Sequence, residues 1–311
     1  MNAATTSVRH MACPLCEAGC GLLCTVEPFA DSFVRGPRVV LVRGDRDDVH
    51  SGGYLCPKAS ALRDLHDDPD RIRRPLVRRD GELVEVSFDE AFAEIERRLL
   101  PIRDTHGPAS CALAIGNPAV HRTGLVLYLL DLAAALGSPN VFSAATLDQM
   151  PKHVAVGEMY GDPYSMPVPD IDRTDLLVLI GTNPMVSNGS MWSVPDFRGR
   201  ARALQGRGGR IVVIDPRRTE TAEVADLHFP IRPGADVYLL AAVVHTLFGD
   251  GLVRLGAVGG HVDGLAALGA AVAPFSPDLV AERCGIAADE IRALARSLAA
   301  SPGAVVSGRL G

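Results

Sequence analysis

The chain has 311 residues, of which 47% are apolar, with a formal net charge of −6 and seven cysteines. This length allows two or three domains, and the composition is that of a globular protein. The negative charge disfavours nucleic acid or an anionic membrane as partner. The sequence has no apolar run of eighteen residues, so no membrane-spanning helix is predicted. The N-terminal stretch has neither an apolar leader nor a twin arginine. A cytoplasmic location is therefore expected by default, and cysteines there bind metals more often than they form disulfides.

Three cysteines lie within eight residues near the N-terminus. Cys13, Cys16 and Cys20 follow the spacing C-x2-C-x3-C, and Cys56 comes after a long gap, directly before a proline. Four thiolates in this arrangement can ligate an iron–sulfur cluster, and glycines around the third thiol allow a tight loop. Zinc or unligated buried thiols are alternatives, although structural zinc usually pairs two C-x-x-C units. Cys24 is a fifth thiol that could substitute as a ligand.

The segment around these cysteines is predicted to be small and β-rich. Two apolar runs, residues 22–26 and 39–42, indicate a hairpin. Such a small domain buries little surface, so a metal would supply part of its folding energy. The charged residues 59–79 indicate a solvated connector. A short strand at 83–86 is then expected, followed by a helix that begins with the capping box Ser87 to Glu90 and ends at Pro101.

Three apolar strands are predicted further along, each followed by a turn and then by polar or helical sequence. They cover residues 110–115, 175–180 and 210–214, and the turns read G-N-P, G-T-N-P and D-P-R-R-T. Helices are expected at 123–136, near 196–204, at 237–248 and at 289–298, with a last strand at 304–306. Apolar strands alternating with helices predict a parallel sheet, in which ligands bind at the carboxyl ends of the strands. Cys111 and Cys284 stand alone and are expected in the core.

The turns carry side chains suited to a nucleotide. Asp215 can accept hydrogen bonds from a base or ribose edge, while Arg217 and Thr219 can hold phosphate or sugar oxygens. Amide groups after Gly181 and the side chain of Asn183 can face a pyrophosphate at a helix start. Each string taken alone is also a good turn sequence, and D-P-R-R-T could simply begin a helix with Asp215 as its N-cap.

In combination these strings resemble the molybdopterin oxidoreductases, a family that contains formate dehydrogenases, nitrate reductases and relatives of dimethyl sulfoxide reductase. The resemblance spans residues 13–311 and is carried by G-Y-L-C-P-K, S-F-D-E-A, I-G-T-N-P, V-I-D-P-R-R-T-E-T-A and I-R-P-G-A-D. It implies an α/β fold: a small N-terminal iron–sulfur β-rich domain, then Rossmann-like parallel-sheet domains, incomplete at the C-terminus. The implied domains are residues 1–68 for the cluster, 69–140 (resuming at about 303–311) for the first α/β domain, and 141–302 for a dinucleotide-binding domain.

The resemblance also implies cofactors and their ligands. These are a [4Fe–4S] cluster on Cys13, Cys16, Cys20 and Cys56, and a pair of molybdopterin guanine dinucleotides that chelate molybdenum or tungsten. Lys58 matches a lysine between cluster and pterin on the electron path. The residues expected to bind the dinucleotide are Gly116, Asn117, Gly181, Asn183, Pro184, Asp215, Pro216, Arg217, Thr219, Gly234 and Asp236.

Two departures from the family pattern stand out. Many relatives place a cysteine, selenocysteine or serine ligand on the loop that matches residues 143–154, which here has no cysteine and no well-placed serine. Asp148 is a candidate metal ligand, because some nitrate reductase relatives use aspartate, and His153 is a candidate ligand or acid/base group. Alternatively Asp148 is a cap and His153 a hydrogen-bonded loop residue. The family's catalytic subunits are also much longer, so the sequence corresponds to an N-terminal portion.

The expected function is two-electron redox chemistry on a small substrate, formate or an oxyanion such as nitrate. Electrons would pass from the pterin by Lys58 to the cluster and on to an electron-transfer partner protein or subunit. The rival is a non-catalytic electron-transfer subunit resembling the large iron–sulfur subunit of NADH dehydrogenase, which the missing thiol ligand favours. The intact D-P-R-x-T and R-P-G-x-D strings favour the enzyme. A zinc-stabilised Rossmann-like scaffold is a third interpretation.

Overall fold

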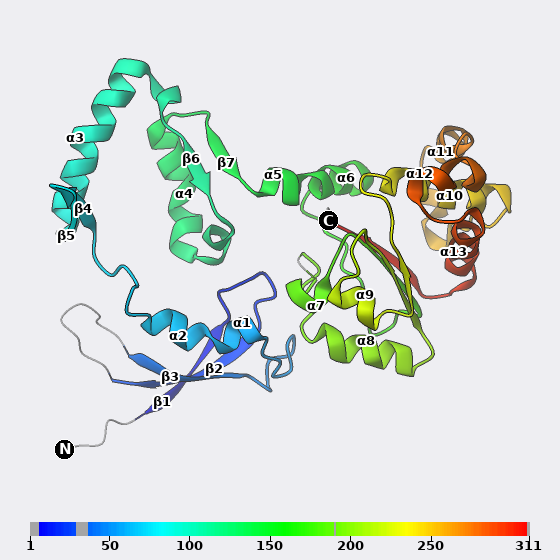
Figure 1. Cartoon of the computed structure of the whole chain (residues 1–311), viewed down its shortest axis with the longest axis horizontal. Helices are drawn as coiled ribbons and strands as arrows, with labels where there is room; N and C mark the ends of the chain where they lie inside the picture. Colours follow the sequence, from blue (N-terminus) through cyan, green and yellow to red (C-terminus); the bar gives the residue numbers. More distant parts are fainter. Residues whose placement is uncertain (1–5, 29–36, 190, 310–311) are drawn as a thin grey trace. The chain divides into compact units, whose positions relative to one another are not determined.

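A computed structural model describes residues 6–28, 37–189 and 191–309 of the chain. The chain divides into two compact units, Met1–Pro163 and Tyr164–Gly311. The first unit carries the cysteine-rich segment, and the second is built on a parallel sheet (Figure 1). Among the described residues no single helix is long and apolar enough to cross a membrane; one helix pair bent by 69°, Leu265–Val272 with Pro277–Cys284, meets the requirement in length and composition alone.

The first unit begins with a three-stranded antiparallel sheet of β1 (Ser7–Ala12), β2 (Gly21–Glu27) and β3 (Arg38–Gly44). The predicted hairpin is confirmed, and alternate residues of β2 are buried, as expected for a strand with one face on a core. Two short helices follow, α1 (Pro57–Ser60) and α2 (Leu62–Asp67). The predicted connector is thus partly helical, because a proline suits the first turn of a helix and Arg38 pairs with Asp67 at 3.1 Å to hold α2 on β3.

A hairpin and a long helix come next. The hairpin joins β4 (Leu76–Arg79) to β5 (Glu82–Glu85), and α3 (Phe88–His106) begins with the predicted capping box. The predicted end of this helix at Pro101 is wrong, because α3 continues through it to His106. Proline removes one hydrogen bond to the carbonyl four residues back. That carbonyl belongs to Arg97, which is exposed, so water can replace the lost donor.

The remainder of the first unit contains one parallel strand pair. β6 (Leu113–Ile115) pairs with β7 (Val141–Ser143), and the crossover includes the 3₁₀ helix Asn117–His121 and helix α4 (Thr123–Leu136). The bounds of α4 and its end at Gly137, which has φ 68°, match the prediction. Because β7 pairs with β6, this strand groups with the first α/β segment, whereas the sequence placed it in the domain 141–302. Two helices follow, α5 (Ala145–Asp148) and α6 (Met150–Tyr160).

The second unit contains a four-stranded sheet in the order β10-β9-β8-β11. The strands are β8 (Leu176–Ile180), β9 (Arg210–Ile214), β10 (Leu227–Phe229) and β11 (Ala304–Gly308), and all neighbours are parallel. Every residue of β8 is buried, which suits an inner strand covered on both faces. β11 pairs with β8, so these last residues extend this sheet, whereas the sequence assigned them to the first α/β domain.

Helices cover both faces of this sheet (Figure 1). One face of β8 and β9 packs on a layer that includes α8 (Phe197–Gly206), through Phe197, Ala201 and Leu204. The opposite face packs on α10 (Asp236–Gly249), α12 (Pro277–Cys284) and α13 (Ala288–Ala300). Three further helices complete the unit: α7 (Pro184–Ser187), α9 (Glu220–Val224) and α11 (Leu265–Val272). Cys111 and Cys284 are buried, as predicted.

Candidate functional site

The four predicted cluster ligands gather in one region of the first unit. Cys13, Cys20 and Cys56 are buried in the same side-chain cluster, with Cys16 packed against it. The Cys13 amide donates to the Cys20 carbonyl at 2.8 Å, which closes the loop that carries the first three thiols. Gly19 has φ 58° and its amide donates to the Cys16 carbonyl at 3.2 Å, so this position needs a glycine. Each of the seven cysteines is a free thiol.

The electrostatics of these thiols favour a cationic ligand. Burial raises the pKa of Cys20 to about 11, and the neighbouring Cys16, Cys13 and Cys56 add to the shift. Burial also raises the pKa of Cys13, while the charge of Lys58 opposes the rise. The donor set therefore fits an iron–sulfur cluster, whose positive iron would stabilise thiolates that are unfavourable alone. Within the ranges that the structure describes, no three or more His, Cys, Asp or Glu side chains form a group ready for a single metal ion.

Lys58 lies beside these thiols. It is an exposed residue of α1, the short helix that begins directly after Cys56. The effect of its charge on Cys13 shows that the ammonium is close enough to influence the thiols. Its expected position between the cluster and the pterin, and its role in electron transfer, stay predictions.

The second unit brings three of the predicted cofactor-binding turns to one edge. Gly181 follows β8 and Asp215 follows β9, and these parallel strands end in register at Ile180 and Ile214. The Gly181 amide donates to the Ile214 carbonyl at 3.0 Å. The two turns therefore leave the same edge of the sheet, as predicted. Gly181 has φ 59°, a left-handed conformation that favours glycine at this turn.

Side chains lock these two turns together. The Asn183 amide donates to the Glu220 carboxylate at 2.7 Å and accepts from the Thr221 hydroxyl at 2.6 Å. Hydrogen bonds from its own backbone amide and from Asn183 help to hold the pKa of Glu220 below its ordinary value. Asn183 was expected to face a pyrophosphate; here both ends of its amide join the turn after β8 to α9. Pro184 begins α7.

The D-P-R-R-T segment forms a tight turn and then a helix cap. The Asp215 carboxylate accepts from the Arg217 amide at 2.8 Å across Pro216. Thr219, rather than Asp215, is the N-cap of α9, because its hydroxyl accepts from the Ala222 amide at 3.1 Å. Thr219 is 2% exposed, so it can contact a cofactor only if this turn shifts.

The turn after β10 completes this edge. β10 lies parallel to β9, so residues 230–236 leave the sheet on the same side. Gly234 has φ 76°, and the Ala235 amide donates to the Arg232 carbonyl at 3.1 Å. Asp236 is the first residue of α10. Its carboxylate therefore lies in the first turn of a fourteen-residue helix.

The remaining predicted residues lie in the first unit. Gly116 follows β6 and precedes the 3₁₀ helix, of which Asn117 is the first residue. The predicted loop 143–154 is largely helical, with Asp148 at the end of α5 and His153 in α6. Pro151 sits in the first turn of α6, where its missing N–H costs nothing. One His153 ring nitrogen, Nδ1, lies 2.7 Å from the Pro163 carbonyl.

Sequence reasoning missed His121. This residue ends the 3₁₀ helix that follows β6, and its ring nitrogen Nε2 is buried with no hydrogen-bond partner in the part of the chain that the structure describes. A buried unpaired nitrogen is costly, so it marks a position where a polar partner fits. Its placement beyond the carboxyl end of a parallel strand is the signal that could have found it.

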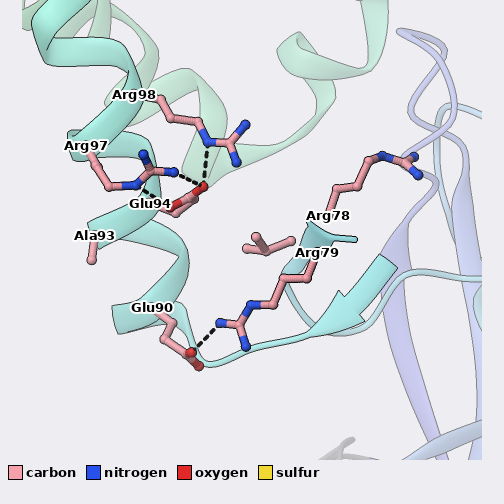
Figure 2. Close-up of a pocket in the computed structure, with 8 residues that line it drawn as sticks. Arg78, Arg79, Glu90, Ala93, Glu94, Arg97 and Arg98 are labelled. Atoms are coloured by element: carbon pink, nitrogen blue, oxygen red, sulfur yellow. Dashed lines mark hydrogen bonds and ion pairs between the residues drawn. The ribbon is translucent and has the colours of Figure 1, made fainter. Parts of the chain in front are cut away.

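A pocket of about 430 Å³ lies between β4 and α3 (Figure 2). Three of its four arginines are already ion-paired: Arg79 contacts Glu90 at 2.8 Å, and Arg97 contacts Glu94 at 2.7 Å. Arg98 also binds Glu94. The hydrogen bond from Arg97, and to a smaller extent that from Arg98, lowers the pKa of the Glu94 carboxyl to about 2. The lining carries four arginines against two glutamates, so positive charge is in excess, although Arg79, Arg97 and Arg98 are each already ion-paired.

A domain with clustered buried thiols, followed by a parallel sheet with turns gathered on its carboxyl edge, is an arrangement suited to a protein that holds an iron–sulfur cluster and a second cofactor. Residues 6–68 match the molybdopterin oxidoreductase Fe4S4 domain and residues 71–254 match the molybdopterin oxidoreductase family. The chain belongs to the molybdopterin oxidoreductases. Its cofactors are accordingly a [4Fe–4S] cluster and a molybdopterin cofactor with molybdenum or tungsten.

Several characterised proteins are similar to most of the chain. It is 28% identical to a nitrate reductase of Symbiobacterium thermophilum, over 93% of this chain and 38% of that protein. It is 31% identical to the thiosulfate reductase molybdopterin-containing subunit of Salmonella typhimurium, over 94% of this chain and 37% of that protein. It is 27% identical to formate dehydrogenase H of Escherichia coli, over 94% of this chain and 40% of that protein. The chain thus spans about two fifths of the length of these relatives.

A solved structure has the same fold. The acetylene hydratase from Pelobacter acetylenicus superposes with a TM-score of 0.74 at 24% identity, over 96% of this chain and 40% of that one. Family membership and this likeness confirm the predicted fold class: a β-rich Fe4S4 domain followed by parallel-sheet α/β structure.

Proposed function

We propose that this chain is the N-terminal part of a catalytic subunit that performs two-electron redox chemistry on a small substrate, formate or an oxyanion such as nitrate. The observation that carries the proposal is that the turns at Gly181, Asp215 and Gly234 leave the same carboxyl edge of the four-stranded sheet in the second unit. The relatives named nitrate reductase and formate dehydrogenase support these substrate classes.

In this proposal the residues of the chain bind and orient the cofactor. The turns around Gly181 and Gly234 supply backbone amides, and Asp215 and Asp236 supply carboxylates for guanine or ribose groups of a molybdopterin guanine dinucleotide. Arg217 supplies a guanidinium for a phosphate. Asn183 contributes indirectly in this proposal, because its hydrogen bonds hold the turn after β8 against α9. The bound cofactor supplies the two-electron chemistry at its metal.

Cys13, Cys16, Cys20 and Cys56 hold the [4Fe–4S] cluster in this proposal, and Lys58 places a positive charge beside it. A cation there favours the reduced form of the cluster, which suits an electron path. Asp148 and His153 are the candidates for the metal end of the cofactor. His153 is held by the Pro163 carbonyl, which orients its ring. An electron-transfer protein or subunit is the proposed partner.

The test is metal, pterin and activity analysis of the complete subunit, purified without oxygen. We expect iron and sulfide, molybdenum or tungsten, and a guanine nucleotide released on denaturation. Formate oxidation and nitrate reduction with artificial electron carriers are then compared. Turnover of either substrate supports the proposal, and a pterin-free protein that contains only an iron–sulfur cluster would overturn it in favour of the electron-transfer subunit.

The electron-transfer alternative is weaker because of the carboxyl edge. A subunit without pterin has no need for the glycines Gly181 and Gly234 and the carboxylates Asp215 and Asp236 in the turns at one edge of a sheet. The match to the molybdopterin oxidoreductase family also includes β8, β9 and β10 of this sheet, and it ends at residue 254.

A further inference from the structure

The backbone of Gly21, the residue after Cys20, is bound on both sides to the loop that leads to Cys56. The Gly21 amide donates to the Asp48 carboxylate at 3.1 Å and to the Ser51 hydroxyl oxygen at 3.2 Å. The Gly21 carbonyl accepts from the Asp45 amide at 2.9 Å. This short segment therefore ties the third thiol to the loop before the fourth.

Asp48 is the centre of this arrangement. The same carboxylate oxygen, Oδ2, that binds Gly21 also accepts from the Ser51 amide at 2.8 Å and from the Ser51 hydroxyl. Ser51 is buried, and the Tyr54 amide donates to its carbonyl at 2.9 Å just before Cys56. The Ser51 hydroxyl, followed by the Ser51 and Gly21 amides, lowers the pKa of Asp48 to about 2, so its carboxylate is charged at neutral pH.

The loop packs closely against the backbone at Gly21 and Gly44. A Cβ added to Gly21 would lie 2.6 Å from the Asp48 Cβ, and a Cβ added to Gly44 would lie 2.1 Å from the Gly53 carbonyl oxygen. The loop thus packs directly on the backbone at the ends of β2 and β3, and only glycine fits at these two positions.

We propose that Asp48 is a positioning residue for the iron–sulfur cluster: its carboxylate fixes Cys20 relative to Cys56, which are far apart in the sequence. The proposal rests on the proposed ligand set. Preorganised thiols lose less freedom when the cluster binds, so the cluster is held more tightly. A fixed negative charge close to the cluster also disfavours the arriving electron, so removal of the charge raises the reduction potential.

Three variants of the full chain test this role. Asp48→Ala removes the acceptor, Asp48→Asn keeps an oxygen acceptor but removes the charge, and Asp47→Asn is the matched control. Asp47 is exposed and lies in the same loop, so its variant changes charge without touching Gly21. The measurements are the rate of cluster loss to an iron chelator and the reduction potential of the cluster.

We expect Asp48→Ala to lose its cluster about tenfold faster, from the loss of charge-assisted hydrogen bonds. Asp48→Asn should recover most of the retention, yet have a higher potential than Asp47→Asn. Ser51→Ala should also speed cluster loss, which keeps the idea testable if Asp48→Ala fails to fold. Wild-type retention and potential in Asp48→Ala would overturn the proposal. Cys20→Ala separates the two ideas: if it keeps the cluster spectrum, the ligand set is wrong whatever Asp48 does.

Discussion

Alkaline pH should destabilise the cluster-free protein, because its buried thiols resist ionisation. The pKa of Cys20 lies at about 11, against an ordinary value of 9.0. Between these two values the unfolded chain has lost the proton while the folded chain retains it. The free energy of unfolding therefore falls as the pH rises through this window, and the contribution is fully present only below 9.0.

The size of the effect follows from the shift. Two pH units correspond to about 2.7 kcal/mol, since each unit is worth about 1.4 kcal/mol. Burial also raises the pKa values of Cys13 and Cys24, so these thiols act in the same direction. The expected loss is a large fraction of the stability of a small domain.

Urea unfolding of the reduced, cluster-free chain from about pH 8 to about pH 11 measures this effect. Circular dichroism follows the whole chain, and the fluorescence of Trp192, which lies in the second unit, reports on that unit as an internal control. Cys20→Ala should reduce the alkaline loss in the first unit and leave the Trp192 transition as in the wild type. Identical pH dependence in wild type and Cys20→Ala would show that the Cys20 thiol does not cause the alkaline loss of stability.

Three further predictions follow from named contacts. Lys58→Met should lower the reduction potential of the cluster and slow electron transfer more than it weakens substrate binding. A charge at an assumed ~6 Å in a dielectric of ~20 contributes about 2–3 kcal/mol before screening. Lys58→Arg should restore only part of the loss, and an unchanged potential and turnover in Lys58→Met would show that Lys58 is a simple surface residue. Asn183→Ala should cost about 1–3 kcal/mol in urea unfolding, because Thr221 and Glu220 lose their partner; a double-mutant cycle with Thr221→Val should show coupling, and strict additivity would argue against the network. Leu177→Ala in β8 should cost about 2–5 kcal/mol, whereas Leu279→Ala at an exposed site should cost less than about 0.5 kcal/mol; equal costs would contradict the assigned core.

The sequence predicted those elements whose signals are local. The unbroken apolar run at residues 176–180 indicated a buried parallel strand, and β8 is buried throughout. The Ser87 to Glu90 capping box and the glycine after α4 marked helix ends correctly. The turns at Gly181 and Asp215 were predicted to share an edge because carboxyl ends of parallel strands do.

Features that depend on long-range pairing were harder to predict. β11 joins β8 across more than a hundred residues, and nothing in its own sequence selects this neighbour over β6. Helix α3 continues through the exposed Pro101, which was expected to end it, and α6 lies partly in residues 143–154, which were expected to be a loop. The roles of Asn183 and Asp48 depend on the fold, since their partners become neighbours only when two turns meet.

In the proposed site four thiols of this chain hold one [4Fe–4S] cluster, and iron and acid-labile sulfide analysis measures that cluster. Protein purified without oxygen should contain about four iron and four sulfide per chain, with an absorption band that bleaches on reduction. The Cys20→Ala and Cys56→Ala variants should each lose the band, and Cys24→Ala should keep it. Zinc in place of iron, or a full cluster in Cys20→Ala, would contradict the account.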